Sequence, residues 1–242
     1  MVKSPLPIPT SERERALLDW VSRAGVADFD RLVSRFFRAE DETLQEASPR
    51  AEAALKRLVA KGYLNARPLV VEGAKAAKTG KANPAARHHV LRGYSLTAHA
   101  SASLALPPPP KLRESFVEHH LRTLDALADA ERHQLAAGNQ VLGFKMETQI
   151  MSEASLGKDF RAQAAARTPE VVSKLPDAQL TIQRPDGTVE HVNVEYVSAK
   201  YSDQMIREKA AAWRGQSTVW AAPNPATAAR VLAVTGQLAV LV

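Results

Sequence analysis

Residues 176–200, PDAQLTIQRPDGTVEHVNVEYVSAK, decide the fold of the second half of the chain. Two segments rich in β-branched and apolar residues, 178–183 and 190–197, flank the sequence RPDG at 184–187. Proline presets φ at the second position of a turn, and Asp-Gly tolerates positive φ. The stretch therefore predicts a β-hairpin.

Two acidic residues occupy unusual places beside this hairpin. Asp177 precedes the first strand, and Glu195 lies within an apolar part of the second. A carboxylate buried in a strand is costly unless it is paired or holds a cation. Two carboxylates on adjacent strands, with Lys200 just beyond, are what Mg²⁺- or Mn²⁺-assisted phosphodiester hydrolysis needs. Counting outwards from the turn places Asp177 nearly opposite Glu195, so we expect one shared site.

The composition limits the class of protein. A chain of 242 residues allows one large or two small domains, and 45% hydrophobic with 24% charged residues is typical of soluble globular proteins. The absence of cysteine excludes disulfides and thiolate chemistry. A net charge of +6 favours an anionic partner, nucleic acid first. Without a signal-peptide pattern or an apolar run of ~18 residues, we expect a cytoplasmic protein that is not associated with a membrane.

The first hundred residues predict a winged helix-turn-helix. Apolar periodicity indicates helices at 11–23, 28–38 and 48–61, the last with Ser-Pro as its N-cap and first helical residue. Two strand-like segments, 63–71 and 87–94, follow. Three short helices before a two-stranded ribbon are typical of this fold.

Basic residues gather on the third predicted helix and in the loop between the two strands. In a winged helix the third helix enters the major groove, and the wing follows the backbone or the minor groove. Arg50 is expected at the helix N-terminus, where base contacts concentrate, and Lys56 and Arg57 are expected to contact phosphate. A solvated helix face is the alternative explanation for any one of these cations. The predicted residues for binding double-stranded DNA are Arg50, Lys56, Arg57, Lys61, Lys75, Lys78, Lys81 and Arg87.

Four consecutive prolines, Pro107–Pro110, mark the domain boundary, because they form a stiff polyproline II spacer. The predicted organisation is a winged helix-turn-helix domain at 10–106, a linker at 107–111 and a second domain at 112–242.

The second domain is predicted to be a mixed sheet flanked by helices, in the α+β or α/β class. Helical spacing covers 112–137, and 140–151 is predicted to be a strand. His119 and His120 lack a useful metal-ligand spacing, so a capping or core-edge role is expected. After the hairpin, the pattern predicts a helix at 202–214, a strand at 218–221, a helix at 225–234 and a strand at 238–242.

These residues carry a resemblance to known families. The PDA sequence at 176–178, with a hairpin and an acidic residue in the next strand, resembles the PD-(D/E)XK nuclease superfamily. The order of the whole chain resembles the bacterial replication-relaxation family, in which a winged helix precedes a nuclease-like domain. YSLTAHA at 94–100 is similar to the segment that closes many bacterial winged helices, and EHHLRTLDA at 118–126 to the start of the nuclease-like half.

The resemblance implies roles for particular residues. Asp177 and Glu195 would be metal ligands and catalytic groups, with Glu147 as a third ligand and Glu153 as its rival. The superfamily places a lysine two residues after the acid, where this chain has Val197. Either Lys200 or Lys209 would then supply the catalytic amine.

Three functions remain open. One is a DNA-binding protein of replication, plasmid maintenance or DNA processing, with nuclease activity retained or lost. Another is an active Mg²⁺-dependent DNA endonuclease, and the third is a transcription regulator whose C-terminal half senses a ligand or forms a homodimer. The missing lysine favours the first, and the retained Asp177 and Glu195 favour the second. The sequence has no glycine-rich phosphate loop or Ser/His/Asp arrangement to support other enzymes.

Overall fold

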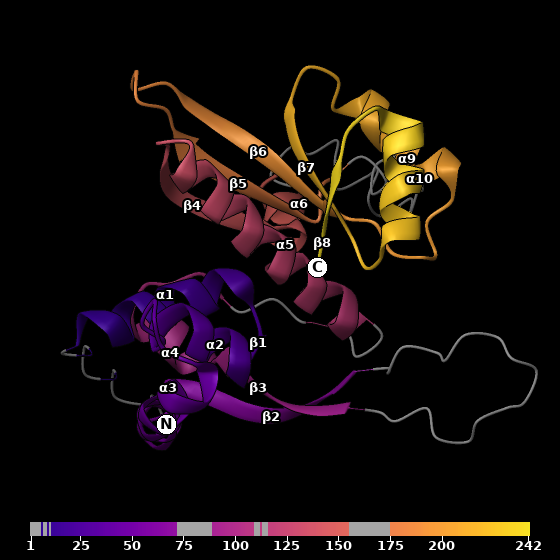
Figure 1. Ribbon diagram of the computed structural model, residues 1–242. Helices are drawn as coiled ribbons and strands as arrows, with labels where there is room; N and C mark the ends of the chain where they lie inside the picture. The colour runs from indigo at the N-terminus through magenta and orange to yellow at the C-terminus, as the bar shows by residue number, and fades with distance from the viewer. Residues whose placement is uncertain are drawn as a thin grey trace, which may run out of the picture. The chain divides into compact units, whose positions relative to one another are not determined.

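The computed structural model describes residues 6, 9, 11–71, 89–108, 112, 116–154 and 175–242. The chain divides into two compact units, Met1–Glu118 (unit 1) and His119–Val242 (unit 2). The described residues form eight helices and two sheets, so the protein belongs to the mixed α and β class (Figure 1). None of the described helices combines the length and the apolar character needed to cross a membrane.

Unit 1 is built on four helices and a small sheet. The helices are α1 (Glu12–Ala24), α2 (Phe29–Phe36), α3 (Leu44–Ala60) and the short α4 (Ala98–Ser103). Their apolar faces form a core in which the largest buried side chains include Leu17, Leu18, Leu32, Leu55 and Leu58. The first two predicted helices are present with nearly the predicted bounds.

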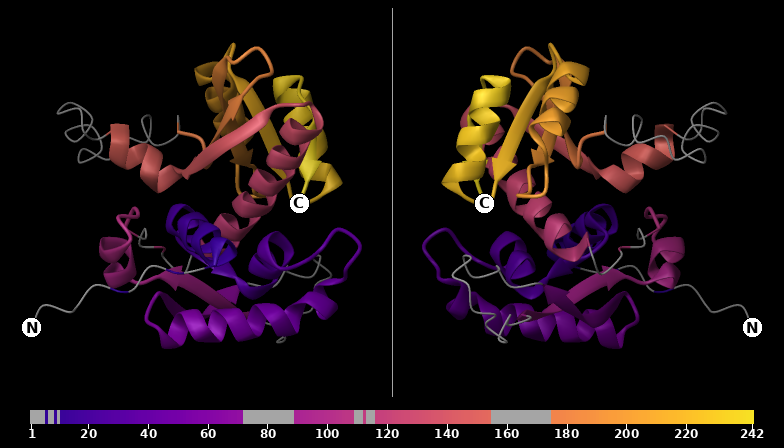
Figure 2. Two further views of the ribbon diagram at one scale, coloured as in Figure 1. Left: turned by 90° about the vertical axis from the view of Figure 1, so that its left-hand side faces the viewer. Right: turned by 90° about the vertical axis from the view of Figure 1, so that its right-hand side faces the viewer.

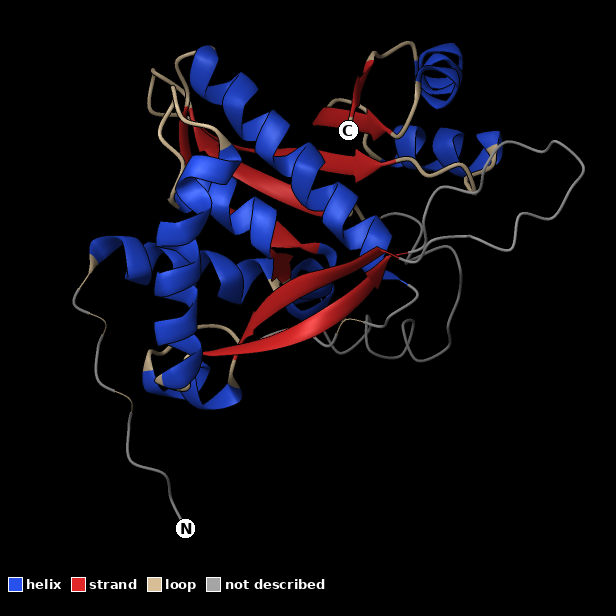
Figure 3. Cartoon of the chain, turned by 60° about the horizontal axis from the view of Figure 1, so that its bottom comes forward, coloured by secondary structure: helices blue, strands red, loops and turns tan. Residues whose placement is uncertain are grey.

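The sheet of unit 1 has the order β1-β3-β2, with both pairings antiparallel. Its strands are β1 (Ala27–Asp28), β2 (Leu64–Val71) and β3 (His89–Leu96), and Figure 3 shows the last two as a twisted ribbon. Gly93 of β3 is required by packing, since a Cβ there would lie 2.4 Å from Leu69 Cγ. The loop at 72–88 lies outside the described residues. So do the predicted DNA contacts on it, Lys75, Lys78, Lys81 and Arg87.

Helix α3 begins at Leu44 and not at Ser48, so the predicted start was wrong. The reason is a capping box: Thr43 Oγ1 accepts from the Glu46 backbone N–H (3.3 Å), and Glu46 Oε2 accepts from the Thr43 backbone N–H (2.8 Å). Ser48 lies within the helix, where its Oγ donates to the Leu44 carbonyl (2.7 Å), and Pro49 is also internal. The Ser-Pro pair therefore does not mark the helix start.

Unit 2 contains a five-stranded sheet with the order β4-β5-β6-β7-β8. The first two pairings are antiparallel and the last two are parallel. The predicted hairpin is present, because the Gly187 N–H donates to the Arg184 carbonyl (2.9 Å) and Gly187 has a φ of +86°. The strands are β4 (Gln140–Met146), β5 (Ala178–Gln183), β6 (Val189–Tyr196), β7 (Ser217–Ala222) and β8 (Ala239–Leu241).

Four described helices accompany this sheet. They are α5 (Val117–Ala136), α6 (Glu147–Ala154), α9 (Asp203–Ala212) and α10 (Pro225–Thr235). Helices α9 and α10 pack against each other, and α10 also contacts β7 and β8. Their shared core is formed by Val197, Ile206, Trp213, Trp220 and Val231.

The predicted strand at 140–151 is shorter than expected. It ends at Met146, and Figure 2 shows β4 leading directly into α6. Two hydrogen bonds explain the change: the Met146 N–H donates to Gln149 Oε1 (3.2 Å), and the Glu147 N–H donates to the Asp177 carbonyl (2.8 Å). Glu147 is therefore the first residue of a helix. The prediction of a linker at 107–111 stays a prediction, because residues 109–111 lie outside the described residues.

Candidate functional site

A buried polar cluster lies in unit 2, where the start of β5 meets the end of β6. We name it the carboxylate cluster and define it as His119, Glu147, Asp177, Glu195, Tyr201 and Lys209. Its side chains come from α5, α6, the hairpin strands, the loop before α9 and α9 itself.

The hairpin register brings the two predicted acids together. Ala178 pairs with Val194, so Asp177 lies beside Glu195 at the end of the ladder. The Asp177 N–H donates to Glu195 Oε2 (3.2 Å), and the Tyr196 N–H donates to Asp177 Oδ2 (2.9 Å). Asp177 and Glu195 are 7% and 0% exposed. They form one buried site.

Lys209 supplies the amine of this site. Its Nζ lies 2.5 Å from Glu195 Oε1 and donates to the Leu175 carbonyl at 3.0 Å. The ammonium also lies 5.7 Å from the ring centre of Tyr201 and 5.2 Å from that of Trp213. The other candidate, Lys200, is exposed, and no described contact of Lys200 reaches the carboxylates. Of the two lysines that the sequence left open, only Lys209 belongs to the cluster.

His119 and Tyr201 complete the cluster, although sequence analysis did not assign them to it. His119 Nε2 lies 3.0 Å from Asp177 Oδ1, and the Tyr201 hydroxyl donates to Glu195 Oε1 (2.9 Å). The His119 ring also stacks on the Tyr201 ring, with 6.5 Å between centres, and meets the Tyr196 ring edge-on at 5.3 Å. His119 was expected to cap a helix or lie at the core edge; it is a partner of Asp177 instead. No local spacing could have indicated it.

The electrostatics of the cluster follow from burial and from these pairings. Burial raises the pKa of Glu195 to about 8; the charge of Asp177 adds to this effect, and Lys209 opposes it. Burial also acts to raise the pKa of Asp177, but the charge of His119, its hydrogen bond and Lys209 together lower it. Burial acts to lower the pKa of His119, but the charge of Asp177, its hydrogen bond and the charges of Glu195 and Glu147 together raise it. Burial raises the pKa of Tyr201, and the charges of Asp177 and Glu195 raise it further.

Glu147 is the remaining carboxylate of the cluster. Burial raises its pKa, and the nearby charge of Asp177 raises it further. Within the described part of the chain its carboxylate has no hydrogen bond or ion pair. Its rival Glu153 is exposed and forms an ion pair with Lys145 (2.6 Å), and no described contact brings it to the cluster. The structure therefore favours Glu147 over Glu153 as the third carboxylate.

The donor chemistry of the cluster suits a divalent metal, but the chain's own donors already contact the carboxylates of Asp177 and Glu195. Carboxylate oxygens are the ligands that Mg²⁺ prefers. However, all four carboxylate oxygens of Asp177 and Glu195 already accept from His119, Tyr196, Tyr201, Lys209 or the Asp177 N–H. No group of three or more His, Cys, Asp or Glu arranged to hold a metal was found among the described residues. Asp177, Glu195 and Glu147 are the residues that would hold a metal, in competition with Lys209 and His119.

Arg50 has a structural role that its sequence position did not predict. Because α3 begins at Leu44, Arg50 is not at the helix N-terminus, as had been expected. Its Nη1 lies 2.6 Å from Glu42 Oε1, and its Nη2 donates to the Phe37 carbonyl (2.8 Å). Arg50 thus ties α3 to the segment that follows α2, although its side chain is still 51% exposed.

The other described cations of α3 are exposed, and two of them have acidic partners. Lys56 Nζ lies 3.2 Å from Glu52 Oε1, and Arg57 Nη2 lies 3.3 Å from Glu14 Oε1. Lys61, the C-cap residue of the helix, has no ion pair in the part of the chain that the structure describes. Exposed pairs contribute about 0–1 kcal/mol, so a phosphate can replace such a partner at small cost.

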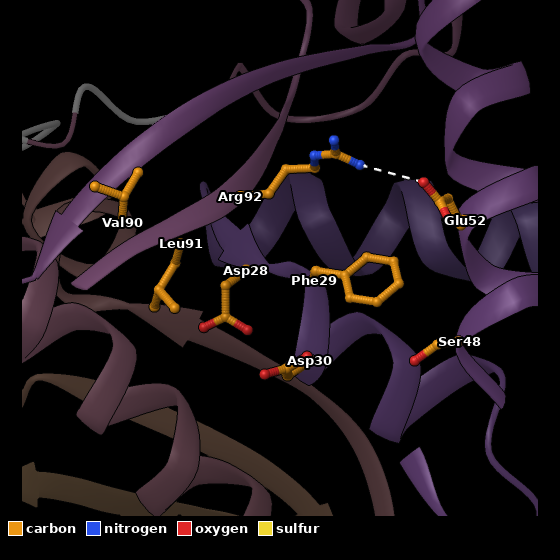
Figure 4. Close-up of a pocket in the computed structure, with 8 residues that line it drawn as sticks. All are labelled: Asp28, Phe29, Asp30, Ser48, Glu52, Val90, Leu91 and Arg92. Carbon is orange, nitrogen blue, oxygen red and sulfur yellow. Dashed lines mark ion pairs between the residues drawn. The ribbon is translucent and has the colours of Figure 1, made fainter. Parts of the chain in front are cut away.

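A hollow in unit 1, between the start of α2, helix α3 and β3, has mixed charge (Figure 4). Asp28, Asp30 and Glu52 line it together with Arg92. Arg92 reaches across to Glu52, with 3.7 Å between Nη1 and Oε1. Glu52 therefore neutralises cations on both α3 and β3, and this side of α3 is less basic than the sequence suggested.

Comparison of the chain with known proteins matched no family model, no curated protein and no solved structure. The fold class is mixed α and β, and the site is a buried carboxylate cluster closed by the protein's own cations. Its function is inferred from these residues alone.

Proposed function

We propose that the protein binds double-stranded DNA through unit 1, acting in replication, plasmid maintenance or DNA processing. The order α1, α2, α3, β2, β3, with β1 paired to β3, supports a winged helix-turn-helix. In that fold α3 is the helix that enters the major groove. The net charge of +6 and the exposed cations Lys56, Arg57 and Lys61 support a polyanionic partner.

Unit 2, in this proposal, is a PD-(D/E)XK nuclease-like domain that does not cut DNA. Support for the nuclease-like fold comes from the five-stranded mixed sheet, with Asp177 before β5 and Glu195 in β6. Lys209, on the helix after the hairpin, takes the place of the lysine that is missing at position 197.

One observation supports the proposal that unit 2 does not cleave DNA. Both carboxylate oxygens of Asp177 and both of Glu195 already contact donors of the chain itself. The ammonium of Lys209 and the imidazole of His119 lie against the carboxylates, where a divalent cation would otherwise be held. Removing one partner of a buried ion pair costs about 3–5 kcal/mol. Lys209 and His119 therefore stabilise unit 2, and a metal would have to compete with them for the carboxylates; the cluster in this proposal is a structural core of unit 2.

The experiment that tests DNA binding compares two sets of variants of the full chain. The first set replaces Lys56, Arg57 and Lys61 by alanine. The matched control replaces Arg15, Arg23 and Arg38 by alanine, so that unit 1 loses the same charge at other positions. Fluorescence anisotropy with a labelled duplex should show clearly weaker binding by the first set, at several salt concentrations. Equal affinities for the two sets would overturn the assignment of α3.

A Mg²⁺- or Mn²⁺-dependent DNA endonuclease is the second candidate, and Glu147 is the observation that favours it. The charge of Asp177 contributes to the raised pKa of the Glu147 carboxyl, which has no hydrogen bond or ion pair within the described residues. A bound metal would activate water for phosphodiester hydrolysis. Incubation of supercoiled plasmid with each metal, using the parent and Asp177→Asn, decides between the candidates. Nicking of the plasmid by the parent but not by Asp177→Asn would establish endonuclease activity.

A further inference from the structure

A second site lies in unit 2, away from the carboxylate cluster. It is a hollow of about 480 Å³ between the end of α9, the start of β7 and the end of α10. Its polar lining includes Arg207, Arg214, Gln216 and Gln237, and Trp213 and Trp220 border it. Hollows of a few hundred Å³ with an apolar part and a few polar groups are the usual form of small-ligand sites.

The amide of Gln237 is held in one orientation. The Trp220 Nε1–H, which can only donate, gives a hydrogen bond of 2.6 Å to Gln237 Oε1. The oxygen of this amide is therefore used within the protein, and its NH₂ group is left to donate. In the described part of the chain, that NH₂ group has no partner.

Gln216 is oriented in the same way. Its Oε1 accepts from Asn193 Nδ2 (2.9 Å), and Asn193 Oδ1 accepts in turn from Gln179 Nε2 (3.3 Å). Asn193 is only 2% exposed, so this relay is fixed within the sheet. The NH₂ group of Gln216, like that of Gln237, is a donor without a described partner.

Two arginines add positive charge to these donors. Arg207 lies on α9 and Arg214 just beyond its end, and both line the hollow. Both are exposed, and neither guanidinium has an ion pair among the described residues. Every charged residue that is described in the lining is an arginine. The hollow thus offers amide and guanidinium donors, and none of its described lining residues has a carboxylate that would repel an anion.

We propose that this hollow binds a phosphate group, carried by a nucleotide or by nucleic acid. Guanidinium groups match the geometry of phosphate oxygens, and hydrogen bonds between charged partners are the strong ones. Trp213 and Trp220 are 6% and 1% exposed and border the hollow from within the core, so the phosphate itself is the part of the ligand that the exposed donors recognise. The site lies wholly in unit 2 and does not depend on DNA binding by unit 1.

Tryptophan fluorescence of the full chain tests this proposal, because two of its three tryptophans, Trp213 and Trp220, border the hollow. The Trp20→Phe variant removes the signal of unit 1. Inorganic phosphate, a nucleoside monophosphate and a short single-stranded oligonucleotide without terminal phosphate are titrated separately at constant ionic strength. Saturable binding of the monophosphate well above that of phosphate identifies a nucleotide site. Binding of the oligonucleotide identifies a phosphodiester site.

Four substitutions, made one at a time, separate this site from general charge effects. Gln237→Glu keeps the acceptor for the Trp220 indole and turns the free donor into a carboxylate; Gln216→Glu does the same beside Asn193. These two, Arg207→Ala and Arg214→Ala should each weaken binding about tenfold or more. The control, Arg132→Ala with Arg184→Ala, removes two charges of unit 2 outside the lining and should change affinity less than twofold. Equal affinities in all variants, or no saturable response to any probe, would overturn the proposal.

Discussion

The ammonium of Lys209 lies 2.5 Å from Oε1 of Glu195, and the two side chains are only 6% and 0% exposed. The contact is set by α9, which begins after its N-cap Ser202; the Ser202 Oγ accepts from the Met205 N–H. From there Ile206 and Lys209 follow at helical spacing on the buried side, so the lysine is carried to the end of β6. In the nuclease-like domain that we propose for unit 2, this pair takes the place of the lysine that is missing at position 197.

The first prediction concerns the energy of this pair. Lys209→Met keeps the apolar stem but leaves Glu195 without its cation, so we expect a loss of about 3 kcal/mol in the free energy of unfolding. Glu195→Gln in the Lys209→Met background should restore at least half of that loss, since no buried charge then remains unpaired. Urea denaturation at pH 8 gives both values.

The control for this cycle is Lys145→Met, which breaks the exposed pair between Lys145 and Glu153 in the same unit. That change should cost less than about 1 kcal/mol. If the double variant is as unstable as the sum of the two single variants, the pair does not stabilise unit 2 in the way described.

The second prediction is a fall in stability at alkaline pH. The raised pKa of His119 means that the folded protein holds this proton more tightly than the unfolded chain. Its stabilisation is complete below the unfolded pKa of about 6.5 and disappears as the pH rises through the folded value. Glu195, with a pKa raised from about 4.3 in the unfolded chain to about 8, acts in the same direction across that interval. Asp177 has a lowered pKa, so its contribution is lost only in acid.

Melting temperatures of the parent, measured in EDTA, should therefore decrease from pH 6 to pH 9, an interval chosen to span the unfolded pKa of His and the raised pKa of Glu195. His119→Gln keeps a donor for Asp177 without the charge and should make the decrease shallower, as should Glu195→Gln. His133→Gln, at an exposed position on the same helix, is the control and should keep the slope of the parent. An unchanged slope in His119→Gln would contradict the role of the His119–Asp177 pair.

The hairpin and its two acids could be predicted from the sequence because their determinants are local. The RPDG turn fixes the register, and counting from it places Asp177 beside Glu195. The partners of these acids could not be chosen in the same way. Lys200 and Lys209 are both close in sequence, and the choice depends on the turn between β6 and α9. His119 reaches Asp177 from a helix that precedes β4, and such a long-range contact leaves no periodic signal.

Two element boundaries were missed, one because two local signals competed and the other because of a long-range contact. Ser48-Pro49 is a typical helix start, but Thr43 and Glu46 form a capping box slightly earlier in the chain and set the start. At the end of β4, alternating apolar residues continue past Met146. The Glu147 N–H nevertheless donates to the Asp177 carbonyl, and α6 begins at Glu147. The contact between Glu147 and Asp177 is part of the carboxylate cluster. It depends on where the hairpin lies in the folded protein, so the sequence around Glu147 could not predict it.

The third prediction follows from the capping box. Thr43→Ala removes the acceptor for the Glu46 N–H and should lower the free energy of unfolding by about 1 kcal/mol. Thr43→Ser keeps the hydroxyl and should lose little. Ser48→Ala should also be nearly neutral, because Ser48 is internal to α3 and its hydroxyl only bonds back to Leu44. A larger loss for Ser48→Ala than for Thr43→Ala would mean that α3 starts at Ser48.

The fourth prediction concerns the charge of Glu52, which pairs with Lys56 and, as Figure 4 shows, with Arg92. If α3 and β3 face DNA, Glu52→Gln frees both cations and removes a repulsive charge, so duplex affinity should rise several-fold at low salt. The slope of log affinity against log salt should steepen by about one for each further phosphate that the freed cations neutralise.

The control for Glu52→Gln is Glu118→Gln, which removes one negative charge at the far end of the same unit's sequence. Replacing Lys75, Lys78 and Lys81 by alanine should have the opposite effect and flatten the slope by about one for each phosphate that is no longer neutralised. Should Glu52→Gln bind duplex DNA no better than Glu118→Gln, the surface of α3 and β3 is not the DNA-binding face.

The fifth prediction tests whether Lys209 prevents a divalent metal from binding to the carboxylate cluster. In the parent, Mg²⁺ or Mn²⁺ should raise the melting temperature no more than in Asp177→Asn, because the Asp177 and Glu195 oxygens already have donors. In Lys209→Met, Glu195 Oε1 loses its cation, and Glu147 lies near enough to feel the charge of Asp177. A divalent metal can then take the place of the ammonium, so Mn²⁺ should stabilise Lys209→Met measurably, by mass action on the folded state. Lys145→Met should show no such gain. A large shift in the parent, accompanied by nicking of supercoiled DNA, would show instead that the cluster opens to metal and that the protein is an endonuclease.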